Sequence, residues 1–217
     1  HAMDKIEMLA RILQADGRGP TIVFCRTKRT AQKTSDDLFE RGFRAATIHG
    51  DLGQSAREKA LNDFKAGKSD VLIATDVAAR GIDIDGITHV INYQCPEDEK
   101  TYVHRIGRTA RAGAAGIAVT FVDWDELARW KMIDTALVLG LPEPVETYSS
   151  SEHLFEMLNI PAGSSGRMNK KSATPVDRPK SDRPKTDRAK SEKAVEPKKP
   201  AADRIKRERT RTKRISE

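Results

Sequence analysis

Short apolar runs alternate along the chain with segments in which apolar residues recur at helical spacing. The apolar runs that predict strands are 21–25, 45–48, 71–74, 89–93 and 115–122. The segments that predict helices are 4–15, 28–41, 54–66, 97–108 and 126–139, with a shorter one at 153–160. Short buried strands that alternate with helices indicate a doubly wound α/β fold with a mostly parallel sheet. In such sheets, ligands bind in the loops that follow the carboxyl ends of the strands.

Charge divides the chain into two parts. Residues 164–217 hold 19 Lys and Arg against 8 Asp and Glu, whereas residues 1–163 hold 20 against 24. The net charge of +7 therefore comes from the end of the chain, which we call the basic tail (164–217). The opening residues 1–3 are typical of a cloning scar, so we expect a folded domain over 4–163 that follows a domain missing from this chain.

The basic tail has no Phe, Trp or Tyr and contains a five-residue repeat that starts at Asp177, Asp182 and Asp187. Such a segment cannot bury enough apolar surface to offset the entropy of ordering, so we expect it to be disordered. Two interpretations stay open: a solubilising extension, or a polycationic arm that holds nucleic acid through its phosphates and could add protein contacts.

Cysteine content and hydropathy exclude several classes of protein. Cys25 and Cys95 are too few for a disulfide framework, lack metal-ligand spacing and lie in apolar runs, where buried thiols are common. No signal peptide and no apolar stretch long enough to cross a bilayer is present. We therefore expect a cytoplasmic protein with no metal site and no membrane contact.

The strongest chemical signal is a run of cations in residues 102–113. His104, Arg108 and Arg111 fall on one stripe if the helix continues as a turn, with Arg105 beside them. A merely solvated basic face would contain acids, and none lies between residues 100 and 123. This pattern favours a multiply charged anion as ligand, because guanidinium groups suit phosphate.

Two weaker clusters also follow strands. After the strand at 71–74 come Thr75, which could donate to a phosphate, and then Arg80 and Asp83. Asp83 could accept from a ribose hydroxyl or simply pair with Arg80, and spacing leaves both open. After the strand at 45–48, Gln54 and Arg57 lie at a helix N-terminus, which attracts anions.

Residues 66–69 (Ala-Gly-Lys-Ser) look like the end of a phosphate-binding loop. They lie after a helix and before a strand, however, and a true loop of this kind needs the reverse order. We therefore expect no nucleotide-phosphate cradle in this chain.

Three segments resemble helicase motifs in the expected order. Residues 22–27 resemble motif IV of superfamily-2 helicases, 74–83 motif V, and 104–111 motif VI. The histidine at 104 is similar to the DEAD-box branch, whose C-terminal domain is RecA-like with three α/β/α layers. One departure is Ala110, where the family usually has Gly and where a methyl group would crowd the turn between the arginines.

The resemblance implies half of an ATP-dependent RNA helicase, in which an N-terminal RecA-like domain holds most of the ATP and magnesium. It implies that Arg108, Arg111 and His104 are catalytic, with Arg108 and Arg111 as arginine fingers, and that Asp83 and Gly81 help to bind the nucleotide. Coupling between nucleotide and RNA would involve Arg80, His104 and Arg105. The residues implied to contact the RNA backbone are Arg29, Gly50, Gln54, Arg57, Thr75 and Asp76.

Two other functions remain open on the sequence. One is a non-enzymatic RNA-binding or annealing module that depends on the basic tail. The other is a related translocase on DNA, against which His104 argues only by family analogy.

Overall fold

The computed structural model describes residues 3–82, 84–111, 113 and 115–168. The strands are β1 (Thr21–Phe24), β2 (Ala45–Ile48), β3 (Val71–Ala74), β4 (His89–Asn92) and β5 (Ile117–Thr120). The helices are α1 (Lys5–Ile12), α2 (Lys28–Glu40), α3 (Gln54–Lys65), α4 (Asp76–Ala79), α5 (Glu99–Ile106), α6 (Leu127–Leu137) and α7 (Glu152–Met157), with a 3₁₀ turn, η1 (Trp124–Glu126), before α6. All five expected strands and all six expected helices are present, with ends shifted by up to three residues.

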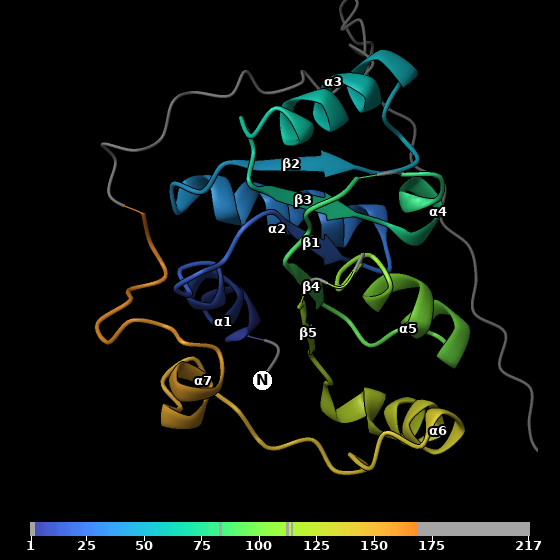
Figure 1. Cartoon of the computed structure of the whole chain (residues 1–217), viewed down its shortest axis with the longest axis vertical. Helices are drawn as coiled ribbons and strands as arrows, with labels where there is room; N and C mark the ends of the chain where they lie inside the picture. Colours follow the sequence, from blue (N-terminus) through green and yellow to red (C-terminus); the bar gives the residue numbers. More distant parts are fainter. Residues whose placement is uncertain (1–2, 83, 112, 114, 169–217) are drawn as a thin grey trace, which may run out of the picture. The chain divides into compact units, whose positions relative to one another are not determined.

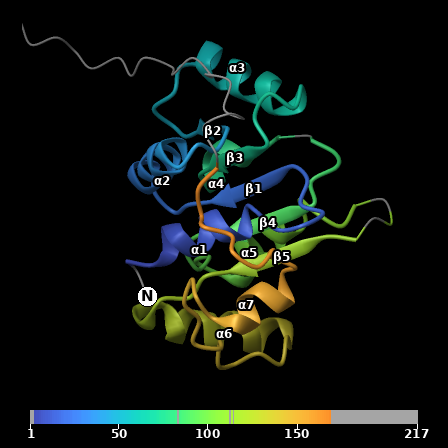
Figure 2. The same cartoon turned by 90° about the vertical axis from the view of Figure 1, so that its left-hand side faces the viewer.

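The strands form one parallel sheet in the order β2-β3-β1-β4-β5 (Figures 1 and 2). β1 lies at its centre, with Val23 opposite Ile73 of β3 and Ile91 of β4. The chain crosses from one side of β1 to the other between β3 and β4, which makes the carboxyl end of β1 the topological switch point. The expected RecA-like α/β fold is confirmed.

Both faces of the sheet are covered, as the continuous apolar runs require. Val23 and Cys25 of the central segment pack into one core with residues of α1, α2 and α7. Ile22 and Phe24 point to the other face and pack with residues of α3 and α4. A third, smaller core lies between α5 and α6, where Tyr102 meets Trp130 edge to face.

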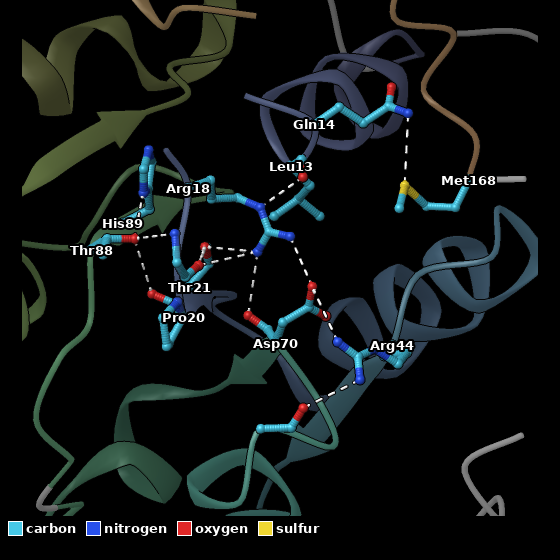
Figure 3. Close-up of polar contacts among 12 residues, drawn as sticks. Leu13, Gln14, Arg18, Pro20, Thr21, Arg44, Asp70, Thr88, His89 and Met168 are labelled. Carbon is cyan, nitrogen blue, oxygen red and sulfur yellow. Dashed lines mark hydrogen bonds and ion pairs between the residues drawn. The ribbon is translucent and has the colours of Figure 1, made fainter. Parts of the chain in front are cut away.

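The amino ends of the strands are tied together by Arg18 (Figure 3). Its Nε donates to the carbonyl oxygen of Leu13 at 2.7 Å, and its Nη2 pairs with Asp70 Oδ2 at 2.8 Å. The Arg18 side chain is only 10% exposed, so water screens this ion pair little. The contact joins the end of α1 to the starts of β1 and β3, at the edge of the sheet opposite the loops that follow the strands' carboxyl ends.

The packed part of the chain continues past Gly163, where we expected it to end. The side-chain amide of Gln14 forms two hydrogen bonds with the backbone of this segment. Its Oε1 accepts from Gly166 N at 2.9 Å, and its Nε2 donates to Arg167 O at 3.0 Å. Met168 N then donates to Arg41 O at 2.8 Å. Residues 164–168 therefore lie against α1 and the end of α2, whereas 169–217, where we expect disorder, lie outside the described residues.

Both cysteines are buried free thiols, as expected. Burial raises the pKa of Cys25 to about 12 and that of Cys95 to about 11. In the part of the chain that the structure describes, no helix is long and apolar enough to cross a membrane.

Because two histidines are buried, we expect the free energy of unfolding to depend on pH. Burial lowers the pKa of His49 and of His89, and the nearby Arg18 lowers that of His89 further. Because the unfolded chain then binds more protons than the folded one, stability should fall as the pH drops below about 6.5, by at most about 1.4 kcal/mol per pH unit for each histidine.

Urea unfolding at pH 7.5, 6.5 and 5.5 measures this effect. Replacing both residues (His49→Asn with His89→Asn) should flatten the dependence between pH 7.5 and 5.5. An equally steep dependence in the double variant would assign it to other groups.

Candidate functional site

A small recess lies at the carboxyl ends of β1, β3 and β4. Figure 1 shows α4 and α5 beyond the arrowheads of these strands. The residues that line the recess come from the end of β1 and from α4 and α5 with their flanking turns: Phe24, Asp76, Ala79, Arg80, Thr101, His104, Arg105 and Arg108. Segments far apart in sequence, resembling motifs V and VI, therefore meet at the switch point, where α/β sheets bind ligands.

α5 is held in place by its first turn and by its packing. Asp98 caps the helix by accepting from Thr101 N at 2.7 Å, and this hydrogen bond lowers the pKa of the Asp98 carboxyl. Tyr102 packs on Trp130 of α6. The helix ends at Ile106, two residues earlier than expected, so Arg108 projects from the following turn.

Arg105, which the sequence pattern placed beside the stripe of His104 and Arg108, is buried inside the domain. Its side chain is 1% exposed, and its Nε and Nη2 each donate to one carboxylate oxygen of Asp76 at 2.7 Å. Its Nη1 donates to Asn92 Oδ1 and to Gln94 O, both at 3.1 Å. The guanidinium also lies 5.3 Å from the ring centre of Phe24. Arg105 thus ties α5 to the loops after β3 and β4.

Asp76 is correspondingly occupied within the domain. Both of its carboxylate oxygens accept from Arg105, and it forms the first residue of α4. The Asp76 side chain is still 32% exposed, and the RNA contact expected of it stays a prediction. This pairing could not be predicted from the sequence, because Asp76 and Arg105 are 29 positions apart in the chain.

Arg108 and Arg80, with His104, form one wall of the recess. Arg108 is half-buried, and its Nη1 donates to the carbonyl oxygen of Ile82 at 2.9 Å, which orients the guanidinium. Among the described residues, no carboxylate pairs with Arg108. His104 and Arg80 are exposed beside it. Among the described residues that line the recess, the only carboxylate is that of Asp76, which is paired with Arg105. An anion is a ligand that would balance the charges of Arg108 and Arg80.

Arg111 lies outside the residues that line the recess. It is exposed, and its Nε donates to the carbonyl oxygen of Gly107 at 2.9 Å. Asp83, expected to bind ribose, lies outside the described residues. Gly81 is exposed with a φ of +73°, a conformation that favours glycine.

The residues expected to contact RNA lie on the loops and helix starts after β1, β2 and β3. Arg29 is exposed in the first turn of α2, which Thr27 caps by accepting from Thr30 N at 3.0 Å. Gly50 and Gln54 are exposed, and Gln54 donates to Glu58. Since α2 and α3 both begin at the carboxyl edge, their free amide groups face the same edge of the sheet.

Two members of this expected set are partly engaged inside the domain. Arg57 is half-buried, and its Nη2 donates to the carbonyl oxygen of Ala78 at 2.8 Å, which links α3 to α4. Thr75 is buried at the end of β3, where its amide donates to Ile48 O at 3.3 Å.

Sequence reasoning missed Asn92, Gln94 and Thr101. Asn92 ends β4, Gln94 lies in the loop after it, and Thr101 lies in the first turn of α5. A polar residue after an apolar strand is a signal that could have found Gln94. Asn92 is fully buried and donates to Thr120 Oγ1 at 3.0 Å, which leaves its oxygen for Arg105.

Ala110 adopts a left-handed backbone with a φ of +55°. A Cβ atom costs about 1–2 kcal/mol in this region, which accounts for the glycine usual at this position. Replacing it (Ala110→Gly) should stabilise the domain by about 0.5–1 kcal/mol, since glycine loses more entropy on folding and offsets part of the gain.

Chemical denaturation of the two proteins tests this, with Ala110→Val as the control that should destabilise because a β-branched residue fits this region poorly. A glycine variant clearly less stable than the parent would show that the turn carries no such strain.

Comparison with known proteins places these motifs in a family. Residues 4–113, just over half of the chain, match the helicase conserved C-terminal domain. The ATP-dependent RNA helicase CshA of Listeria monocytogenes is 50% identical over 134 residues, which cover 62% of this chain and 26% of that protein. The DEAD-box ATP-dependent RNA helicase CshA of Geobacillus kaustophilus is 47% identical over 134 residues, 62% of this chain and 29% of that protein. The chain spans little more than a quarter of these relatives.

Solved structures agree with this. S. cerevisiae Dbp5 bound to RNA and ADP BeF3 superposes with a TM-score of 0.63 at 33% identity, over 74% of this chain and 42% of that one. The E. coli DEAD-box protein SrmB bound to regulator of ribonuclease activity A gives a TM-score of 0.61 at 32% identity, over 70% of this chain and 93% of that one. The chain therefore belongs to the helicase conserved C-terminal domain family, as the C-terminal domain of a DEAD-box helicase of superfamily 2.

Proposed function

We propose that this domain supplies one side of the ATP site of an ATP-dependent RNA helicase, opposite an N-terminal RecA-like domain. The observation that carries the proposal is the recess in which Arg108, His104 and Arg80 gather with no acid paired to Arg108 among the described residues. The names of the relatives, which are ATP-dependent RNA helicases, support the same function.

In the proposed mechanism, Arg108 and Arg111 contact the transferred phosphoryl group when the two domains close on ATP. Negative charge spreads over its oxygens in the transition state, and guanidinium groups positioned beforehand stabilise that charge. Arg108 is suited to this because its bond to Ile82 O fixes its direction while leaving four of its five N–H groups. Asp83 would accept from the ribose, beside Gly81.

Magnesium and most of the triphosphate would be held by the N-terminal domain. In the part of this chain that the structure describes, no group of three His, Cys, Asp or Glu could hold a metal ion, and the Asp76 carboxylate at the recess is already paired with Arg105. Bound magnesium would neutralise charge on the phosphates. The role left to this domain is to add cations from the opposite side.

RNA would bind along the carboxyl edge through its sugar-phosphate backbone. Arg29 and Gln54 are exposed there, and the open space at Gly50 allows the RNA backbone to approach closely. Arg57 is half-buried and Thr75 is buried at the same edge. Contacts of this kind carry no base identity, which predicts binding that is independent of sequence. Arg80 and His104, which line the nucleotide recess at the same edge, would couple the nucleotide to the RNA. ATP and RNA meet in the cytoplasm, where we propose the protein acts.

ATPase measurements test the proposal. This chain alone should not hydrolyse ATP, whereas the full-length helicase, in which it follows its N-terminal domain, should hydrolyse ATP and be stimulated by RNA. RNA and DNA of one sequence, compared as stimulators, separate the helicase from a DNA translocase. Equal stimulation by both, or none by RNA, would contradict the proposal.

A second role, RNA binding by the basic tail, is favoured by its surplus of 11 positive charges. Removing 169–217 rather than 164–217 keeps the contacts of Gly166 and Met168 with the body. The truncated protein should bind RNA more weakly and with a flatter dependence on salt, because fewer counterions are released. An unchanged salt slope would rule out the tail as an RNA-binding arm.

A further inference from the structure

A closed ring of contacts joins the loop after β1 to the loop after β4. The backbone N–H of Arg26 donates to Gln94 Oε1 at 3.1 Å. The guanidinium of Arg26 pairs with Glu126 Oε1 at 3.0 Å, and Glu126 Oε2 accepts from Cys95 N at 3.3 Å. Because Cys95 follows Gln94 in the chain, these contacts return to their starting point. The two loops are therefore connected twice.

The ring is anchored by a buried carboxylate. Glu126 is 1% exposed, and besides its ring contacts it accepts from Asp123 N at 3.2 Å, which closes a capping box at the start of η1. Arg129 Nη1 also lies 3.7 Å from Glu126 Oε1, so the carboxylate has two guanidinium partners. Separating Arg26 from Glu126 would remove the nearer partner from a buried charge, which is unfavourable. The loop after β1 cannot shift relative to Gln94 and Cys95 without that loss.

The ring connects the two surfaces on which the proposed function depends. On one side, Arg26 precedes Thr27, the cap of α2, whose first turn carries the RNA-facing Arg29. On the other side, the carbonyl oxygen of Gln94 accepts from Arg105 Nη1 at 3.1 Å, and Arg105 belongs to the helix that presents His104 to the recess. Gln94 thus accepts from the loop after β1 through its side chain and from α5 through its main-chain carbonyl.

We propose that Gln94 is a positioning residue that transmits RNA binding at the loop after β1 to α5 and the nucleotide recess. This inference rests on the proposed function. The ring is a contiguous network of contacts from the loop before α2 through Gln94 to Arg105, and networks of this kind carry energetic coupling between sites. Removing the amide oxygen of Gln94 breaks one link of the ring and leaves the nucleotide and RNA contacts themselves untouched.

The test is a measurement of coupling in the full-length helicase. RNA affinity is measured with and without ADP and beryllium fluoride, and affinity for that analogue is measured with and without RNA. In Gln94→Leu, which keeps the side-chain volume but loses the acceptor, the factor by which each ligand strengthens the other should fall about 3- to 10-fold. By linkage the two factors must fall equally, and each affinity measured alone should stay within about twofold of the parent.

Matched variants separate positioning from folding. Gln94→Glu keeps an acceptor oxygen and should retain the coupling, whereas Gln94→Asn keeps the amide but is shorter by one methylene and should lose it. If Gln94→Leu unfolds at a much lower temperature than the parent, its coupling factor is not informative. The coupling factors of Gln94→Glu and Gln94→Asn are then compared instead. Parent-like coupling in the Leu or Asn variant, or weaker RNA binding in the absence of nucleotide, overturns the inference. Absence of coupling in the parent itself would instead count against the proposed function.

Discussion

ATP hydrolysis by the full-length helicase should slow by about a thousandfold or more when Arg108 is replaced by alanine. Guanidinium groups that contact the transferred phosphoryl group contribute about three to five orders of magnitude in related enzymes. In this domain Arg108 is half-buried and directed by Ile82 O, and no carboxylate among the described residues competes for it. The loss should appear in kcat at saturating RNA, since the interaction strengthens as charge develops in the transition state.

Two controls keep this result specific. Arg108→Lys keeps the charge but not the planar fork and should recover only a small part of the rate. RNA affinity without nucleotide should match the parent, because Arg108 lies in the recess and not among the exposed residues of α2 and α3. A kcat within tenfold of the parent in Arg108→Ala would remove this residue from the catalytic site.

Unfolding of this chain in urea should require about 3 kcal/mol less free energy when Arg105 is replaced by alanine. The change removes a buried guanidinium with four hydrogen bonds, leaves Asp76 without its counter-charge and leaves Asn92 and Gln94 each with one contact fewer. Breaking a buried ion pair from one side costs about 3–5 kcal/mol, and the lower figure applies because the Asp76 side chain is 32% exposed.

A double-mutant cycle isolates the pair from the packing of Arg105 on Phe24. Asp76→Asn alone should destabilise less than Arg105→Ala, because the amide still accepts one hydrogen bond. The Arg105→Ala cost measured in the Asp76→Asn background should be smaller than in the parent. Independent effects of the two changes would show that the ion pair contributes little and that packing dominates.

The strands were predictable because each is a short run of residues that can be buried on both faces, such as 71–74, and their carboxyl-end loops follow from the parallel sheet. Arg105 was not predictable. Its burial depends on Asp76, Asn92 and Gln94, which lie on separate loops and meet only in the folded domain. Helical spacing grouped it with His104 and Arg108, since spacing within one helix says nothing of the partners around it.

Other differences have local causes. α4 is four residues long, too short for a periodic pattern to be recognised. Residues 164–168 were assigned to the basic tail on composition. Their backbone groups are nevertheless hydrogen-bonded to the side chain of Gln14 and to the carbonyl oxygen of Arg41, and composition does not report such bonds. The left-handed turn at Ala110 carries no sequence signal of its own, because alanine is not the residue that this conformation favours.

The central claim is that the arginines of this domain act on a triphosphate presented by a neighbouring domain. The most direct measurement is RNA-stimulated ATP hydrolysis by the full-length helicase in which both Arg108 and Arg111 are alanine. We predict that hydrolysis falls to the background without RNA, while the protein stays folded and binds RNA as the parent does. Hydrolysis at the parent rate in this variant would contradict the account.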